Sequence, residues 1–428
     1  MRTRGVVLLG AGLTYLTGSI LLPFAASGSR PGLRFAGFAL MVAAYGVSAL
    51  ALLQPKDKSV TLWELALLLG FGILFRLALL AGSPWDLGSS LGFPAPEPPG
   101  LMPRPPGMPP QPPLGVALSV WILGVRAEAW IGYLFLALCE LGTWAVLLMM
   151  LEASRESSAW LLLYVWNPLA ALAGATGALS CAAGFLLVLA LWFFSRGLSG
   201  RGVALLGSAA AGSYALFPAL VAVVAGPLRR TLAGPVRRKL VGAATVAAVV
   251  ASGGLVALLW PSWREAFSQA LRQGSQNAGP FALVQWLTGS RLAAWAAAGA
   301  TCALVAVAFR RKQPLSVLSG TLKAAVLSAP VVLAGGLYVL TPVLVFRPSV
   351  AWAGFTCAVL LLQVGRPLCG HPGEPVPWSW LIVEYGGLAL ALVAEWVVGW
   401  RVKRAGGPPA SPAAGAGAAV KSDEKRAY

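Results

Sequence analysis

The acidic side chains that could do chemistry gather in one proline-rich stretch. Residues 82–115, "GSPWDLGSSLGFPAPEPPGLMPRPPGMPPQPPLG", contain twelve of the chain's 32 prolines together with Asp86 and Glu97. A carboxylate can act as a general base for a hydroxyl group, and Asp86 is one of only three aspartates in the chain. The alternative is a solvated or helix-capping carboxylate, which is the commoner state of a lone loop aspartate. For Glu97, the solvated state is favoured.

Donors elsewhere in the sequence could bind an anionic group. Arg76 lies towards the end of the apolar run before the proline-rich stretch, where its guanidinium could clamp a phosphate or reach the membrane interface. Arg264 and Asn277 belong to a second polar stretch, 261–281, although a hydrated loop would have the same composition. His371 is the only histidine and the five cysteines show no CxxC spacing, so we predict no metal site built from these residues and no cofactor. The use of a divalent metal by the reaction stays open.

Ionised groups inside apolar segments are costly and demand partners. Besides Arg76, four glutamates fall in such segments, namely Glu64, Glu140, Glu384 and Glu395. Buried carboxylates of this kind mark either a function or hydrogen bonds between helices. Structural roles are favoured for all four.

The composition determines which elements can position these residues. The chain has 428 residues, is 58% hydrophobic and 11% charged, and has a mean hydropathy of +0.76. Apolar windows of about 18 residues recur along almost its whole length, and only helices satisfy their own backbone hydrogen bonds in lipid. We therefore predict an all-α, polytopic transmembrane bundle of about ten to twelve hydrophobic helices.

The net charge of +18 is a topology signal and does not indicate a nucleic-acid-binding surface. The basic residues lie in short clusters between apolar runs, chiefly Arg229, Arg230, Arg237, Arg238 and Lys239, then Arg310, Arg311 and Lys312, then Arg401, Lys403 and Arg404. The positive-inside rule places these clusters in the cytoplasm. Both termini are then cytoplasmic, and residues 82–113 form an extracytoplasmic loop.

The apolar runs give the predicted organisation. We expect one transmembrane domain over residues 1–404 and a disordered cytoplasmic tail over 405–428, which is rich in Ala, Gly and Pro. Two breaks are predicted, at "NP" and at "SYALFP". The predicted hydrophobic segments are 6–26, 35–53, 60–81, 114–125 on the outer face, 128–150, 158–174, 179–195, 203–228, 240–260, 292–309, 324–335, 337–346, 350–365 and 380–400.

Several short motifs occur in the chain in the same order as in a known protein family, although each motif alone is weak. The motifs are "ILFRLALLAGSP", "PPQPPLGVAL", "LLYVWNPLAALAGATG", "SYALFPAL", "NAGPFALVQWL" and "IVEYGGLALALVAEW". In this order, over roughly residues 60–400, the chain resembles GT-C type membrane glycosyltransferases. It is specifically similar to bacterial polyprenyl-phosphate-mannose-dependent mannosyltransferases of the inner membrane.

The resemblance implies transfer of a sugar, mannose in the enzymes it resembles, from a polyprenyl phosphate to a lipid or glycan acceptor. Asp86 would be the catalytic base and Arg76 would lie near the phosphate. Trp85 could stack on the sugar, with membrane-interface anchoring as the alternative. Glu97, Arg264 and Asn277 would complete the binding site. Membrane lipid and the polyprenyl-phosphate sugar are the implied partners.

The chain departs from the family at most of its polar positions. Where the family has a His-Asn-Asp cluster, the chain has Ala178, Leu179 and Ser180, and Ala215 replaces the lysine of a Lys-Leu-Phe-Pro break. Residues 333–336 read Leu-Ala-Gly-Gly where the family has His-Pro-Trp-Tyr. Since each lost 1.4 kcal/mol of transition-state stabilisation costs about tenfold in rate, a non-catalytic descendant that binds lipid or an envelope partner is the alternative. A secondary transporter ranks lower, because no paired broken helices in matching halves are visible.

Overall fold

The computed structural model of the chain describes residues 2–26, 31–52, 60–80, 129–175, 178, 180–213, 216–225, 279–329, 334–369 and 378–405. Within these ranges the regular elements are all helices. The N-terminal part contains α1 (Arg2–Ala26), α2 (Pro31–Leu52), α3 (Leu62–Leu80), α6 (Ala129–Ala153), the 3-10 helix η1 (Ser158–Leu161), α7 (Leu162–Val165) and α8 (Pro168–Ala175). The remainder contains α9 (Ser180–Ser195), α10 (Ser199–Gly212), α11 (Phe217–Ala225), α15 (Gly279–Thr288), α16 (Arg291–Phe309), α17 (Pro314–Leu327), α18 (Ala334–Tyr338), α19 (Thr341–Phe346), α20 (Val350–Cys369) and α21 (Trp378–Ala405).

The described helices are those of a membrane-embedded protein. Six are long and apolar enough to cross a bilayer, and a seventh span results if the bent pair Ser158–Val165 and Pro168–Ala175 is counted as one. Shorter apolar helices, such as α9 and α17, accompany them. The all-helical prediction is therefore confirmed for the described residues, whereas the count of ten to twelve stays a prediction.

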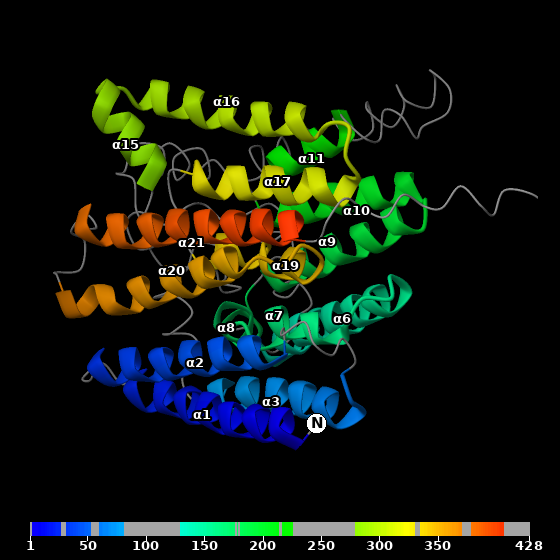
Figure 1. Cartoon of the computed structure of the whole chain (residues 1–428), viewed down its shortest axis with the longest axis vertical. Helices are drawn as coiled ribbons and strands as arrows, with labels where there is room; N and C mark the ends of the chain where they lie inside the picture. The colour runs from blue at the N-terminus through cyan, green and yellow to red at the C-terminus, as the bar shows by residue number, and fades with distance from the viewer. Residues whose placement is uncertain are drawn as a thin grey trace, which may run out of the picture.

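Figure 1 shows most of the helices running across the long axis of the molecule and stacked side by side along it. The first three, α1 to α3, lie at one end, and α15 to α17 lie at the other. Between them, α6 to α9 pack beside α19 to α21. The beginning of α1, the α9–α10 turn and the α16–α17 turn all lie on the same side of the bundle, at the right in this view.

Helices α1 and α2 cross at a pair of glycines. A Cβ built on Gly18 would lie 2.6 Å from the carbonyl oxygen of Gly37, and a Cβ on Gly37 would lie 2.9 Å from the carbonyl oxygen of Gly18. Small residues at a crossing let two backbones approach closely, and in a membrane this close packing is a main source of helix association. The two glycines therefore hold α1 and α2 together.

We expect Gly18→Ala to destabilise the protein by about 1 to 3 kcal/mol, because the new methyl group meets a backbone atom and the helices must separate. Gly10→Ala, on the same helix, is the matched control, since a Cβ there meets nothing within 4 Å. Unfolding of both variants in detergent measures the difference. Equal stability of the two variants would contradict a close glycine crossing.

Two glutamates from apolar segments cap helices. Glu64 accepts a hydrogen bond from the Thr61 backbone N–H (2.9 Å), while the Thr61 hydroxyl accepts one from the Glu64 N–H (3.2 Å). These two reciprocal hydrogen bonds form a capping box at the N-terminal end of α3. Glu395 of α21 accepts hydrogen bonds from the Ser349 hydroxyl and the Ala351 N–H, both at 2.9 Å. Glu395 therefore accepts from a backbone N–H group in the first turn of α20 that has no partner within the helix. Glu64 and Glu395 thus both have the structural roles expected.

The structure corrects two boundaries. The helix predicted over 324–335 lies earlier, at α17, because Pro314 follows the basic turn and supplies the preorganised first residue of a helix. The end of the predicted outer polar stretch, 279–281, is instead the first turn of α15. The predicted segments 114–125 and 240–260, the loop 82–113 and the tail from 406 lie outside the described residues.

Candidate functional site

Arg76 is the only predicted site residue that the structure describes. Asp86, Trp85, Glu97, Arg264 and Asn277 lie outside the described ranges, as does His371. The site can therefore be built from Arg76 and from the buried polar side chains that surround it.

Arg76 lies on α3 and is only 8% exposed. Its Nη1 donates to the carbonyl oxygens of Gly72 (2.9 Å) and Val165 (3.1 Å), and its Nη2 donates to Glu140 Oε1 at 2.6 Å. The guanidinium carbon lies 4.6 Å from the centroid of the Trp144 ring. Both terminal nitrogens are therefore engaged, and the buried Nε is left without a hydrogen-bond partner.

The carboxylate of Glu140 on α6 accepts hydrogen bonds from side chains of four helices. Its Oε1 accepts hydrogen bonds from Arg76 and from the indole N–H of Trp144 (3.2 Å). Its Oε2 accepts one from Tyr164 of α7 and one from Tyr338 of α18, each at 2.6 Å. The carboxylate is 2% exposed, so its charge is compensated by one cation and three neutral donors instead of by water.

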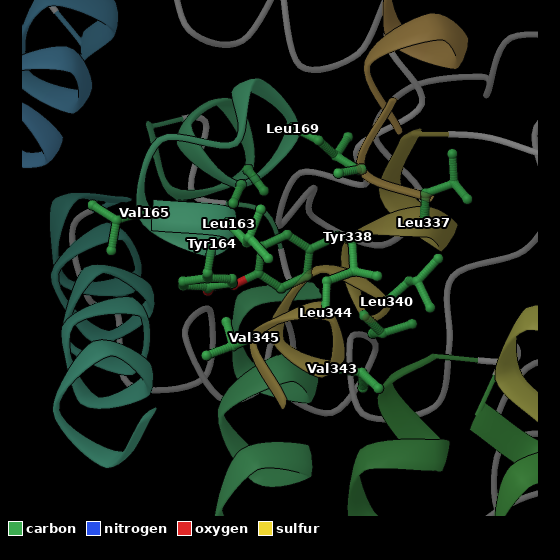
Figure 2. Packing of buried hydrophobic residues seen from close by; sticks show 14 of the residues in the cluster. Leu163, Tyr164, Val165, Leu169, Leu337, Tyr338, Leu340, Val343, Leu344 and Val345 are labelled. Carbon is green, nitrogen blue, oxygen red and sulfur yellow. The ribbon is translucent and has the colours of Figure 1, made fainter. Parts of the chain in front are cut away.

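Apolar side chains enclose the tyrosine half of this network. Figure 2 shows Tyr164 and Tyr338 with their hydroxyl ends turned towards each other, among leucines and valines of α7 and of the segment around α19. The two hydroxyls are in direct contact, and both rings are fully buried. A low local dielectric strengthens each of these hydrogen bonds and raises the cost of leaving one unmade.

Two glycines let neighbouring helices reach the ion pair. A Cβ on Gly174 of α8 would lie 3.0 Å from Arg76 Nε and 3.3 Å from Glu140 Cγ. On α3, a Cβ at Gly72 would lie 2.4 Å from a side-chain carbon of Val165. The backbone of α8 therefore covers the guanidinium directly, and α7 lies close to α3.

The break between α7 and α8 is fixed by its own side chains. Trp166 donates its indole N–H to the carbonyl oxygen of Leu68 (2.8 Å). Asn167 accepts from the Leu169 N–H (3.0 Å) and donates to the Thr356 hydroxyl (3.1 Å). Because Pro168 has no N–H and Asn167 caps the new helix, the chain bends by 62° between the two helical segments. The predicted break is confirmed.

Some of the positions at which the chain departs from the motifs of the family it resembles lie in elements next to this break. Helix α18, which includes Gly336, packs against α8 and α9, and α8 packs against α3. Ala178 is fully buried between α8 and α9. Ser180, at the first turn of α9, is 5% exposed, and its hydroxyl has no partner. Leu179 and Ala215 lie outside the described residues.

The chemical effect of this arrangement is to link α3, α6, α7 and α18 through hydrogen bonds to one buried carboxylate. Three of the five guanidinium N–H groups of Arg76 already donate to Glu140 and to two carbonyl oxygens, and the side chain is buried. The phosphate role of Arg76 stays a prediction. The structural role favoured for Glu140 fits its four hydrogen bonds. Within the described ranges, no three His, Cys, Asp or Glu side chains come together as metal ligands.

Comparisons with known proteins bring no match: no family model fits the chain, and no curated protein or solved structure matches it significantly. What the fold and the site define is a helical membrane protein with a closed polar network at the meeting point of α3, α6, α7 and α18.

Proposed function

We propose that the chain is an integral membrane glycosyltransferase-like protein of GT-C architecture. It transfers a sugar, mannose in the family it resembles, from a polyprenyl phosphate to a lipid or glycan acceptor. The site lies at the extracytoplasmic face of a bacterial inner membrane, with Asp86 as the base. Trp85, Glu97, Arg264 and Asn277 are the proposed substrate contacts, with Arg76 near the phosphate, and both termini are cytoplasmic.

One observation carries this proposal. Helix α3, whose C-terminal end leads into the stretch with Asp86, packs on α8, the helix that follows the 62° bend, and α8 packs in turn on α18. These elements correspond to separate motifs of the family, far apart in the sequence. Their convergence supports a common site close to the end of α3, where a carboxylate, a phosphate and an acceptor hydroxyl could meet.

Asp86→Asn tests the base. Loss of a general base should lower the transfer rate by about 10² to 10⁴-fold, because the acceptor hydroxyl keeps its proton. The measurement is transfer of labelled mannose from polyprenyl-phosphate-mannose to a lipid acceptor, with purified protein in liposomes. Asp57→Asn, in the predicted cytoplasmic loop, is the matched control and should keep the rate. Unchanged transfer by Asp86→Asn would exclude this residue as the base.

A non-catalytic protein that binds lipid or an envelope partner is the second candidate. The observation that favours it is the closed state of Arg76, whose terminal nitrogens already bind Glu140 and two carbonyl groups. Fully buried Ala178 also stands where the family has a polar cluster. This candidate predicts that wild-type protein gives no turnover in the transfer assay but still retains the polyprenyl-phosphate sugar.

A further inference from the structure

The turn between α9 and α10 brings two arginines and two aromatic rings together. Helix α9 ends in the sequence Trp192-Phe193-Phe194-Ser195, and α10 begins four residues later, at Ser199. We call Trp192, Phe193, Arg196, Leu198 and Arg201 the basic tip. Both arginines are exposed, and Leu198 at the turn is 43% exposed.

Each arginine of the basic tip lies against an aromatic ring. The guanidinium carbon of Arg196 is 5.6 Å from the Trp192 ring centroid, and that of Arg201 is 6.0 Å from the Phe193 ring centroid. The two rings pack edge to face with centroids 5.0 Å apart. A ring face attracts a cation without neutralising it, so each arginine keeps its charge while it lies over one of two rings that are in contact.

The backbone of the turn is fixed by two glycines. Gly197 has a φ of 73°, a left-handed conformation that glycine adopts without strain. A Cβ on Gly202 would lie 2.6 Å from the Phe194 ring and 3.1 Å from the carbonyl oxygen of Ala190. Only a glycine at position 202 lets α10 run back so close to α9. The two glycines therefore fix the backbone that carries Arg196 and Arg201.

The positive charge of the basic tip is not balanced within the described part of the chain. Neither Arg196 nor Arg201 forms a salt bridge with another described residue. The tip lies on the same side of the bundle as the α16–α17 turn, which carries exposed Arg310, Arg311 and Lys312 (Figure 1). Both turns therefore present exposed basic side chains that favour contact with anions.

We propose that the basic tip binds the headgroup of an anionic phospholipid. The phosphate would sit between the guanidinium groups of Arg196 and Arg201, and the acyl chains would lie along Trp192 and Leu198. An aromatic ring and an arginine at the end of an apolar helix are the residue types that lie at headgroup level in a bilayer. A lipid is favoured over a soluble anion because the exposed leucine adds an apolar contact that only a lipid can use.

The test is a lipid titration read by native mass spectrometry of the purified full chain in detergent. Phosphatidylglycerol should bind more tightly than phosphatidylcholine. Arg196→Gln/Arg201→Gln should weaken phosphatidylglycerol binding by about tenfold or more, because the phosphate loses its charge-assisted hydrogen bonds to both guanidinium groups. Trp192→Leu, which keeps both charges, should also weaken it.

Arg310→Gln/Arg311→Gln is the matched control, because it removes two exposed charges from a turn of the same side, and it should weaken binding much less. An equal loss in both pairs, or equal affinity for the two lipids, would overturn the proposal. Inorganic phosphate in the millimolar range should not displace phosphatidylglycerol, and displacement would assign the tip to a soluble anion instead. Thermal unfolding in phosphatidylcholine checks that each variant is folded.

Discussion

Glu140→Ala should be the most destabilising single change among the polar residues of the described bundle. It removes the acceptor of four hydrogen bonds and leaves the Arg76 guanidinium buried with no counter-charge. Removal of one partner of a buried ion pair costs about 3 to 5 kcal/mol. We therefore expect the variant to lose a large part of its stability, measured as the free energy of unfolding in detergent or in bicelles.

The double variant Arg76→Met/Glu140→Leu separates the pair from the packing around it. Because replacement of a whole buried ion pair by apolar side chains is often close to neutral, the double variant should recover much of the stability lost in Glu140→Ala. Arg76→Met alone should be destabilised, since it leaves the carboxylate without a cation. If Glu140→Ala unfolds at the wild-type midpoint, the network does not hold the four helices together.

Trp166→Ala should produce the second large loss. The side chain is fully buried and lies among Phe71, Phe75 and Tyr15, with ring centroids 5.9, 5.3 and 6.2 Å away. Truncation of a buried tryptophan costs about 3 to 5 kcal/mol through the cavity that it leaves. The loss is again measured as the free energy of unfolding, with Tyr45→Phe as a buried comparison that removes only a hydroxyl.

Trp166→Phe tells packing apart from the hydrogen bond to Leu68. The phenyl ring keeps most of the aromatic contacts but cannot donate to the Leu68 carbonyl oxygen, so we expect a loss of about 1 kcal/mol. A loss as large as that of Trp166→Ala would show that the hydrogen bond, and not the volume, fixes the break between α7 and α8. Near-neutral behaviour of both variants would contradict a tight core at this position.

The sequence predicted local features of the fold well. The asparagine and proline at 167–168 forced a break because their effect on the backbone is intrinsic. The apolar run of α3 and that of α16 defined helices to within two residues. In contrast, the segment predicted over 324–335 begins ten residues after the true start of α17, because its polar first turns, with Pro314 and Ser316, do not look like part of an apolar span.

The polar network could be predicted only in part. An intramembrane arginine demands a partner, and Glu140 was one of four possible acceptors. The choice of Glu140, 64 residues from Arg76 along the chain, depends on how α3, α6 and α8 pack, and a single sequence carries no signal for it. Tyr338 was missed altogether, because a tyrosine in an apolar run looks like any other core aromatic residue.

The position of α16 at the edge of the bundle makes it the part of the described protein most sensitive to bilayer thickness. Only 6% of its apolar window is buried against other parts of the chain, compared with 50% for α6. Its 19 residues span about 28 Å, close to a hydrocarbon layer of about 30 Å. Since most of its side chains are not buried, we expect α16 to tilt more readily than α6 to match a thinner or thicker membrane, while the ion-paired helices keep their mutual angles.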